Sequence, residues 1–426
     1  MSDNHIIKTL QIRPFLYLII SEFFSQFSMN LINFILLIVV FAIARSNSAV
    51  SGVVIAFTFP TIIFGILAGV LVDRWNKKNV LFLTNFLRAL MVVPLFFLSG
   101  DIFIIYAVTF GISILTQFFI PAETPMIPVL VDRKYLLSAN AIFGMVMYSS
   151  IFLAYALSGP ILFLLGKQNV FFLITVFFLV AAFFASIIRV KRKDAVPKSV
   201  NDTNIGLSFS EEIKTLVTLI SKTKSLYHAL FSLTLAQVLI YVLAVIGPGY
   251  AQSILRIKVE TFPLLFVTPA VIGMTLGALI IGSFLHKKSK SYLTKVGLLV
   301  LGVAILLLPY GAKLESREIV QFINFYLPFF LQINILHIMI VLAFVIGLAT
   351  AFVFIPANTI LQEETSDESR GKIYGLLNSL VGILSFVPVV AVGGLADIIG
   401  VKAVITGIGI IVLIIAAVRI FITDKN

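Results

Sequence analysis

The sequence predicts an all-α integral membrane protein with twelve transmembrane helices in two pseudo-symmetric six-helix bundles. The first observation is composition: 60% of the 426 residues are hydrophobic and 12% are charged, with a mean hydropathy of +1.11. A soluble domain carries about 25% charged residues, so this chain lacks the polar surface that a soluble enzyme needs. The second observation is a series of nearly charge-free runs, and the third is a short motif that occurs in both halves.

The nearly charge-free runs are long enough to cross about 30 Å of hydrocarbon as helices. The twelve predicted spans lie near residues 15–43, 51–72, 80–98, 102–122, 139–166, 170–188, 227–255, 261–285, 296–311, 333–357, 373–396 and 403–421. Continuous runs of this length favour helices over the shorter strands of a barrel. The first run is too long for the apolar part of a signal peptide, so we expect an uncleaved first helix.

Basic residues gather in alternate loops between the predicted spans. The loops on the side of the N-terminus hold clusters at residues 77–78, 189–193 and 287–288, whereas the opposite loops hold isolated residues such as Arg45 and Lys167. By the positive-inside rule we expect a multi-pass protein of the cell (inner or plasma) membrane with both termini in the cytoplasm. The net charge of +12 then reflects topology, and we expect no nucleic-acid partner.

The longest polar segment divides the predicted spans into six and six. We therefore expect an N-terminal bundle over residues 1–189, a cytoplasmic linker over 190–225 and a C-terminal bundle over 226–426. An amphipathic stretch within the linker, Phe209–Leu219, would lie at anionic lipid headgroups.

An internal repeat supports this division. The motif Phe-Ile-Pro-Ala occurs at Phe119–Ala122 and again at Phe354–Ala357, an offset of 235 residues, each time at the end of an apolar span. At the same offset Gly159 corresponds to Gly394. Duplicated halves of this kind place a substrate site near the membrane midplane between them.

The loop after the second span, Gly69–Lys78, resembles the loop between helices two and three of the major facilitator superfamily, whose pattern is G-x-x-x-D-R/K-x-G-R/K-R/K. Five of the six signature positions match: Gly69, Asp73, Arg74, Lys77 and Lys78. Asn76 stands where the family usually has Gly, and Asn tolerates the left-handed conformation better than other residues.

The resemblance implies a gating role for this loop. Gly69 would let two helices approach closely, and Asp73 would stabilise one gate state by facing the N-terminus of helix eleven, near Gly371–Gly375. A loop that only sets topology explains Arg74, Lys77 and Lys78 but not Asp73.

A narrower resemblance extends over nearly the whole chain. Residues 25–28, 121–122, 139–141, 158–160, 362–363 and 370–372 are similar to the macrolide-efflux and siderophore-exporter-like branch of the superfamily. The pair Gly159-Pro160 also resembles part of the helix-five antiporter motif of drug exporters. The resemblance therefore implies export.

Polar residues form stripes within some of the spans. In the first span Glu22, Gln26, Asn30 and Asn33 fall at about 0°, 40°, 80° and 20° around a helix. Polar groups avoid lipid, so we expect these stripes to face water or other helices. They either bind substrate or form hydrogen bonds between helices. The resemblance implies a cavity lined by helices one, four, seven and ten, and the cavity-lining candidates are Gln26, Asn30, Asn33, Ser113, Gln117, Gln237 and Tyr241.

Glu22 and Arg88 are the ionisable residues clearly within hydrocarbon depth. We expect Arg88 to reach the cytoplasmic surface or to pair with Asp73. Glu22 has no obvious basic partner within a span and is the candidate proton-coupling residue; the alternative is a protonated, hydrogen-bonded Glu with a structural role. Glu123, Glu363 and Glu364 are expected at solvated span ends and are weaker candidates.

The sequence indicates a transporter and not an enzyme. It has no G-x-x-x-x-G-K-S/T phosphate-binding loop, no Cys and four dispersed His, so we expect no ATP hydrolysis, no metal and no cofactor. We expect a monomeric, proton-coupled secondary transporter that exports amphipathic or lipophilic small molecules (drug, macrolide or siderophore-like) by alternating access. Its partners would be the substrate, protons and membrane lipids. A lipid or lysolipid flippase, a small-solute importer and a non-transporting scaffold are the alternatives.

Overall fold

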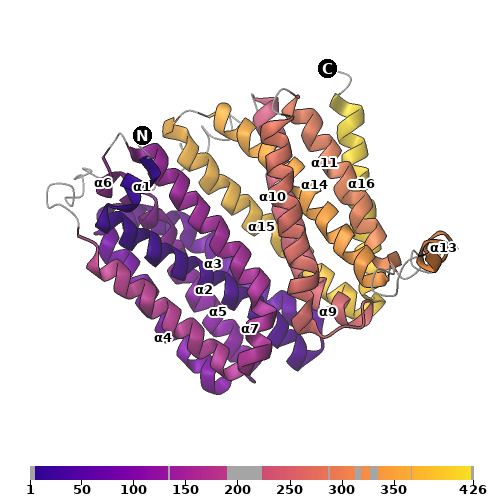
Figure 1. The fold of residues 1–426 in the computed structure, drawn as a ribbon, viewed down its shortest axis with the longest axis horizontal. Helices are drawn as coiled ribbons and strands as arrows, with labels where there is room; N and C mark the ends of the chain where they lie inside the picture. The colour runs from indigo at the N-terminus through magenta and orange to yellow at the C-terminus, as the bar shows by residue number, and fades with distance from the viewer. Residues whose placement is uncertain are drawn as a thin grey trace. The chain divides into compact units, whose positions relative to one another are not determined.

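The computed structural model describes residues 5–132, 135–189, 223–285, 288–311, 318–326, 334–365 and 367–423, and every regular element in these ranges is helical (Figure 1). Eleven helices there are long and apolar enough to cross a membrane. One of them, α7, breaks at Gly166 and contains two predicted spans, 139–166 and 170–188. The prediction of twelve spans is therefore confirmed in the part of the chain that is described.

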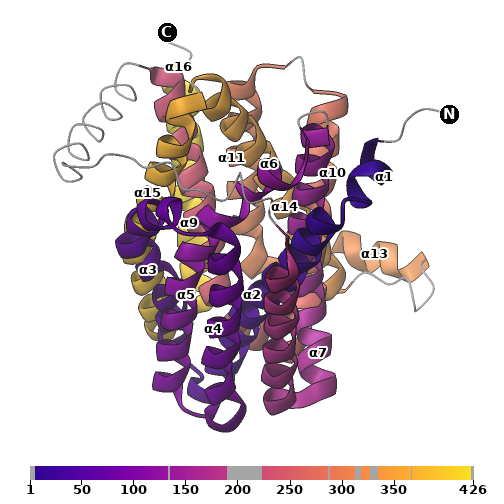
Figure 2. The same cartoon turned by 90° about the vertical axis from the view of Figure 1, so that its left-hand side faces the viewer.

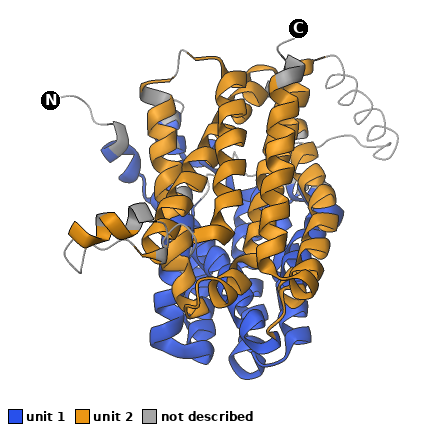
Figure 3. Ribbon diagram, turned by 90° about the vertical axis from the view of Figure 1, so that its right-hand side faces the viewer, with its two compact units in different colours: residues 1–44, 52–203 blue, residues 45–51, 204–426 orange. Residues whose placement is uncertain are grey.

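The chain divides into two compact units, residues 1–44 with 52–203 and residues 45–51 with 204–426 (Figure 3). The predicted linker helix at Phe209–Leu219 lies outside the described residues. The helices of unit 1 are α1 (His5–Leu10), α2 (Arg13–Ala44), α3 (Asn47–Arg74), α4 (Lys77–Leu98), α5 (Ile102–Glu123), α6 (Met126–Leu130) and α7 (Leu136–Ile187).

Unit 1 is held together by α7, which packs along α2 and α4, while α4 also packs on α5 (Figure 2). One buried apolar cluster draws residues from all six helices α2 to α7 and includes Phe119. The break in α7 falls at Gly166, whose φ of 74° is a conformation that other residues rarely adopt.

The helices of unit 2 are α9 (Lys224–Ser253), η3 (Val259–Thr261), the π-helix η4 (Pro263–Val267), α10 (Thr268–Ser283), α11 (Lys290–Leu307), η5 (Leu308–Tyr310), α13 (Glu318–Tyr326), α14 (Ile335–Glu363), α15 (Asp367–Ile399) and α16 (Val401–Thr423). Within this unit α14 packs against α10, α11 and α9. A Cβ atom built on Gly273 of α10 would lie 2.0 Å from the carbonyl oxygen of Phe344, and one on Gly347 of α14 would lie 1.7 Å from that of Ala270. The two backbones are therefore in direct contact, as is common where small residues meet in membrane helices.

The first turn of α3 falls within unit 2, where Asp397, near the end of α15, caps it. The Asp397 carboxylate accepts hydrogen bonds from the backbone N–H groups of Asn47 and Ser48 at 2.8 and 3.0 Å. It also accepts from the hydroxyls of Ser46 and Ser48, both at 2.7 Å, and from the Asn47 amide at 2.9 Å. A carboxylate is favourable at a helix N-terminus, where backbone donors lack partners.

The two copies of the repeat occupy helices α5 and α14, each of which contains the motif's proline. Phe119–Ala122 lies in the last turn of α5 as expected. The expectation that Phe354–Ala357 also ends its span is wrong, because α14 continues to Glu363.

Candidate functional site

Glu22 lies on α2 inside unit 1, with 1% of its surface exposed. Neither of its carboxylate oxygens has a hydrogen-bond partner among the described residues. Leaving a buried carboxylate unpartnered is costly, because the group gives up its hydration without a replacement. Its position on the polar stripe of α2 therefore brings an unsatisfied acceptor into the interior of the unit.

Glu123, the last residue of α5, lies beside Glu22. The expectation that it sits at a solvated span end is wrong, because it is 6% exposed and its Oε2 atom has no hydrogen-bond partner among the residues that the structure describes. The two carboxyl groups are within hydrogen-bonding reach of each other, and both are close to the side chain of Gln26. Packing of α5 against α2 brings these groups together.

Arg88 of α4 is 1% exposed, so the expectation that it reaches the membrane surface is wrong. Its Nη1 atom donates to Ser25 Oγ at 3.1 Å and to Asn85 Oδ1 at 3.4 Å. Its guanidinium carbon lies 4.5 Å from the centre of the Phe119 ring. A guanidinium over an aromatic face gains a cation–π interaction, which helps to hold the charge in the interior.

Arg88 interacts electrostatically with both Glu123 and Glu22. Its Nε and Nη2 atoms nevertheless have no hydrogen-bond acceptor in the described part of the chain. The other expected partner, Asp73, has a side chain outside those that the structure describes. We call Glu22, Glu123 and Arg88, with their neighbours Ser25 and Gln26, the buried charge cluster.

The remaining members of the α2 stripe, Asn30 and Asn33, are half-buried. The Asn30 amide donates to the backbone carbonyl of Gln26 at 2.8 Å, within its own helix. The stripe thus runs from a fully buried carboxyl group to partly exposed amides.

The candidates on α5 and α9 make local contacts. Ser113 donates to the carbonyl of Phe57, and Gln117 donates to the Thr61 hydroxyl at 3.1 Å, so both connect α5 to α3. Interhelical bonds of this kind are the alternative role for polar groups in spans. On α9 Gln237 and Tyr241 lie within hydrogen-bonding reach of each other. A cavity-lining role for these four residues remains a prediction.

The loop that resembles the superfamily signature shows a capped helix start. Asn76 has φ −70° and ψ 108°, an extended conformation, and its side chain accepts a bond from the Asn79 N–H. The expected left-handed role of Asn76 is therefore wrong, since it serves as the N-cap of α4. A Cβ atom on Gly69 would meet nothing within 4 Å among the described residues, and the role of this glycine in a gate remains a prediction.

The charged residues of the same loop are less informative. Lys77 and Lys78 are half-buried in the first turn of α4. The side chains of Asp73 and Arg74 are outside those described, so the gating role remains a prediction. In α7 Gly159 is buried and Pro160 lies inside the helix.

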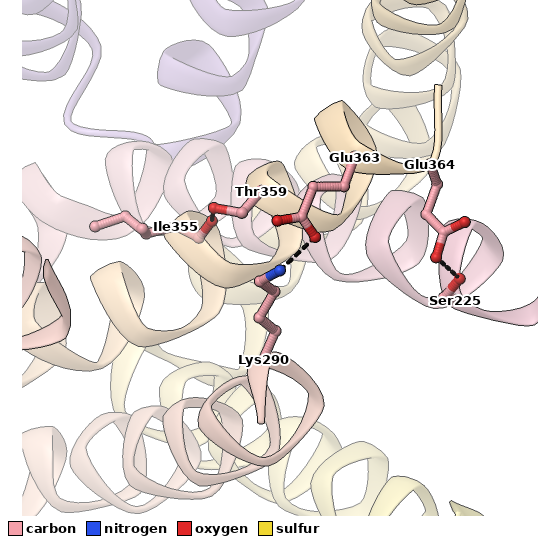
Figure 4. Close-up of polar contacts among 6 residues, drawn as sticks. All are labelled: Ser225, Lys290, Ile355, Thr359, Glu363 and Glu364. Atoms are coloured by element: carbon pink, nitrogen blue, oxygen red, sulfur yellow. Dashed lines mark hydrogen bonds and ion pairs between the residues drawn. The ribbon is translucent and has the colours of Figure 1, made fainter. Parts of the chain in front are cut away.

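Glu363 and Glu364 are exposed at one end of unit 2, as expected (Figure 4). Glu363 pairs with Lys290 at the start of α11, and Glu364 accepts a bond from Ser225 at 2.7 Å. These contacts connect the ends of α9, α11 and α14. Glu363 and Glu364 are therefore exposed carboxyl groups that can serve as controls for the buried ones.

Comparison with known proteins identifies the class of this chain. The family model described as Major Facilitator Superfamily matches residues 18–322. The chain belongs to the major facilitator superfamily. It is 24% identical over 393 residues to an uncharacterized MFS-type transporter, YfiS, of Bacillus subtilis (strain 168), covering 91% of this chain and 87% of that protein.

Solved structures of transporters share the fold. The nucleoside transporter NupG superposes with a TM-score of 0.72 at 13% identity, covering 96% of this chain and 98% of that one. A bacterial homolog of the human lysosomal transporter Spinster, in an inward-facing and unoccupied conformation, gives 0.69 at 14% identity and covers 100% and 98%. As a superfamily member this chain is a multi-pass membrane transporter, which confirms the predicted fold class and the prediction that the chain is a transporter.

Proposed function

We propose that this protein is a proton-coupled secondary transporter that exports amphipathic or lipophilic small molecules by alternating access. The observation that carries the proposal is Glu22, a carboxyl group on a membrane-spanning helix that is 1% exposed and whose two oxygens accept no hydrogen bond from the described residues. A proton is the smallest ligand that satisfies such a group. Reversible protonation at this position would connect the proton gradient to the substrate.

The substrate class is proposed from the chemistry of the spans. The α2 stripe continues from Glu22 through the uncharged amides of Gln26, Asn30 and Asn33, and the chain contains 40 Phe residues. Aromatic side chains with a few polar groups suit an amphipathic molecule such as a drug, a macrolide or a siderophore-like compound. We also propose export, which the Gly159-Pro160 resemblance supports. The distribution of basic loops supports a location in the cell membrane with both termini in the cytoplasm. A monomeric state completes the proposal.

The test is gradient-driven transport in proteoliposomes. A thermal-stability screen against macrolides, siderophores and lysolipids first selects a probe. A lysolipid probe would favour the flippase alternative, and a polar-solute probe would favour the importer alternative. We expect Glu22→Gln to fold and to retain part of the probe binding but to lose transport driven by a pH gradient. The matched control is Glu363→Gln, which removes an exposed carboxylate and should transport like the unmodified protein. A Glu22→Gln protein that still moves protons with the probe would contradict the proposal.

A further inference from the structure

Glu123 and Arg88 are two buried charged groups that coupling through Glu22 alone leaves without a role. We propose that Glu22 and Glu123 hold one exchangeable proton between them and that Arg88 is the fixed counter-charge, so that the coupling site is a carboxyl pair carrying one proton per cycle. This inference rests on the proposed function and specifies its site and stoichiometry.

The contact between the two carboxyl groups requires a proton. Glu22 and Glu123 are within hydrogen-bonding reach of each other, yet both Glu22 oxygens and Glu123 Oε2 accept no hydrogen bond from a donor in the described part of the chain. An ionised carboxylate only accepts hydrogen bonds, whereas a protonated one also donates. Adding one proton to the pair therefore converts an unsatisfied contact into a hydrogen bond.

The charge balance also favours one proton. With both carboxyl groups ionised and Arg88 charged, the buried charge cluster has a net charge of −1; one proton makes it neutral and a second makes it +1. Separate like charges repel strongly in a low-dielectric interior, and an uncompensated charge there is costly. The neutral, singly protonated state is the one that the apolar surroundings of Phe119 favour.

Arg88 is a positioning residue, because its guanidinium is fixed by groups other than the carboxylates. It donates to Ser25 and Asn85, and it lies over the rings of Phe119 and Phe178 at 4.5 and 5.9 Å. Its positive charge therefore stays at the same place whichever of the two carboxyl groups holds the proton.

The charged groups around the pair come from α4 and α5. In the described part of unit 1, the charged groups acting on Glu22 are Glu123 of α5 and Arg88 of α4, and Gln26 of α2 adds a neutral amide. The helix α7, which also packs along α2, contributes the apolar ring of Phe178 near Arg88. The pair and its counter-charge thus form an isolated group on three helices of one unit.

Infrared spectroscopy of the purified protein in lipid tests the shared proton without a substrate. The readout is the pH-dependent stretch of protonated carboxyl groups. We expect the unmodified protein to show one protonated carboxyl group and both Glu22→Gln and Glu123→Gln to lose it, because the single remaining carboxylate is then balanced by Arg88. The control Glu363→Gln should leave the signal unchanged. A Glu123→Gln protein that keeps the full signal, or an unmodified protein with two such groups, would overturn the proposal.

Arg88 variants test the counter-charge in the same experiment. Arg88→Gln should raise the signal about twofold, because both carboxyl groups then need protons, and Arg88→Lys should restore one. An unchanged signal in Arg88→Gln would contradict the role of Arg88; if that variant does not fold, the carboxyl variants and Arg88→Lys decide. Gradient-driven transport on the same samples is a separate readout. Transport that survives in both Gln variants while the signal is lost would contradict the proposed function and the coupling role of the pair, but not the sharing of one proton between Glu22 and Glu123.

Discussion

At the scale of single residues, the unusual feature is an arginine, Arg88, whose whole side chain is buried inside a membrane-spanning unit. Arg88 is tolerated there because Ser25 and Asn85 accept its Nη1 hydrogens and Phe119 covers its face. Ser25 also donates to Asn85 Oδ1 at 2.8 Å, so one hydroxyl connects α2 to α4 twice. The loss of this hydroxyl would leave a buried charged donor with one acceptor fewer.

We therefore predict that Ser25→Ala lowers the stability of the protein by about 1–3 kcal/mol, the range for removing a partner of a buried or charged hydrogen-bonding group. Thermal unfolding in detergent measures the effect. The matched control is Ser28→Ala, since the Ser28 hydroxyl is equally buried but donates only to the Phe24 carbonyl of its own helix. Equal losses in the two variants would show that the contact with Arg88 is not what matters.

At the scale of helices, unit 2 depends on close backbone contact. The carbonyl oxygens of Phe344 and Ala270 occupy the space that a side chain on Gly273 or Gly347 would need. The distances of 2.0 and 1.7 Å are to backbone atoms, which cannot move aside as a flexible side chain can. These glycines therefore set how closely α10 and α14 approach.

We predict that Gly347→Ala destabilises the protein by at least about 1–3 kcal/mol, the usual cost of overpacking. The control is Gly407→Ala in α16, where an added Cβ would meet nothing within 4 Å. Thermal unfolding should separate the two variants clearly, and a Gly347→Ala protein as stable as Gly407→Ala would refute the close-contact account.

A second prediction on the helix scale concerns the Asp397 cap. Asp397→Asn replaces an ionised acceptor of two backbone N–H groups with a neutral one, so the start of α3 should open more often. A lost cap costs about 0.5–2 kcal/mol. Hydrogen exchange at residues 47–51 should accelerate accordingly. Asp101→Asn, which alters the cap of α5, is the control and should affect only the start of that helix.

At the scale of the whole molecule, the absence of cysteine makes the predicted topology easy to test. Single cysteines at the exposed positions Lys167 and Lys288 lie in loops predicted on opposite sides of the membrane. We expect Lys167→Cys to react with an impermeant thiol reagent in intact cells and Lys288→Cys to react only after lysis. The reverse pattern would place the termini outside.

The sequence predicted the spans and the α2 stripe because both depend on local patterns, namely apolar runs and the helical period. It did not predict the buried charge cluster, because Arg88 and Ser25 are 63 residues apart and only tertiary packing joins them. Glu123 was misplaced for the same reason: its position beside a polar loop predicts solvation, whereas α5 packs on α4 and contacts α2 in the folded unit and Glu123 is buried. The Asp397 cap, 350 residues from Asn47, likewise has no local signal.

If a buried carboxyl group on α2 couples the proton gradient to transport, its removal should affect two transport modes differently in the same proteoliposomes. Exchange of labelled for unlabelled probe needs the transport cycle but no gradient, whereas net accumulation needs proton coupling. We expect Glu22→Gln to retain exchange and to lose pH-gradient-driven accumulation, and Glu363→Gln to retain both. Accumulation in Glu22→Gln at the level of the unmodified protein would contradict it.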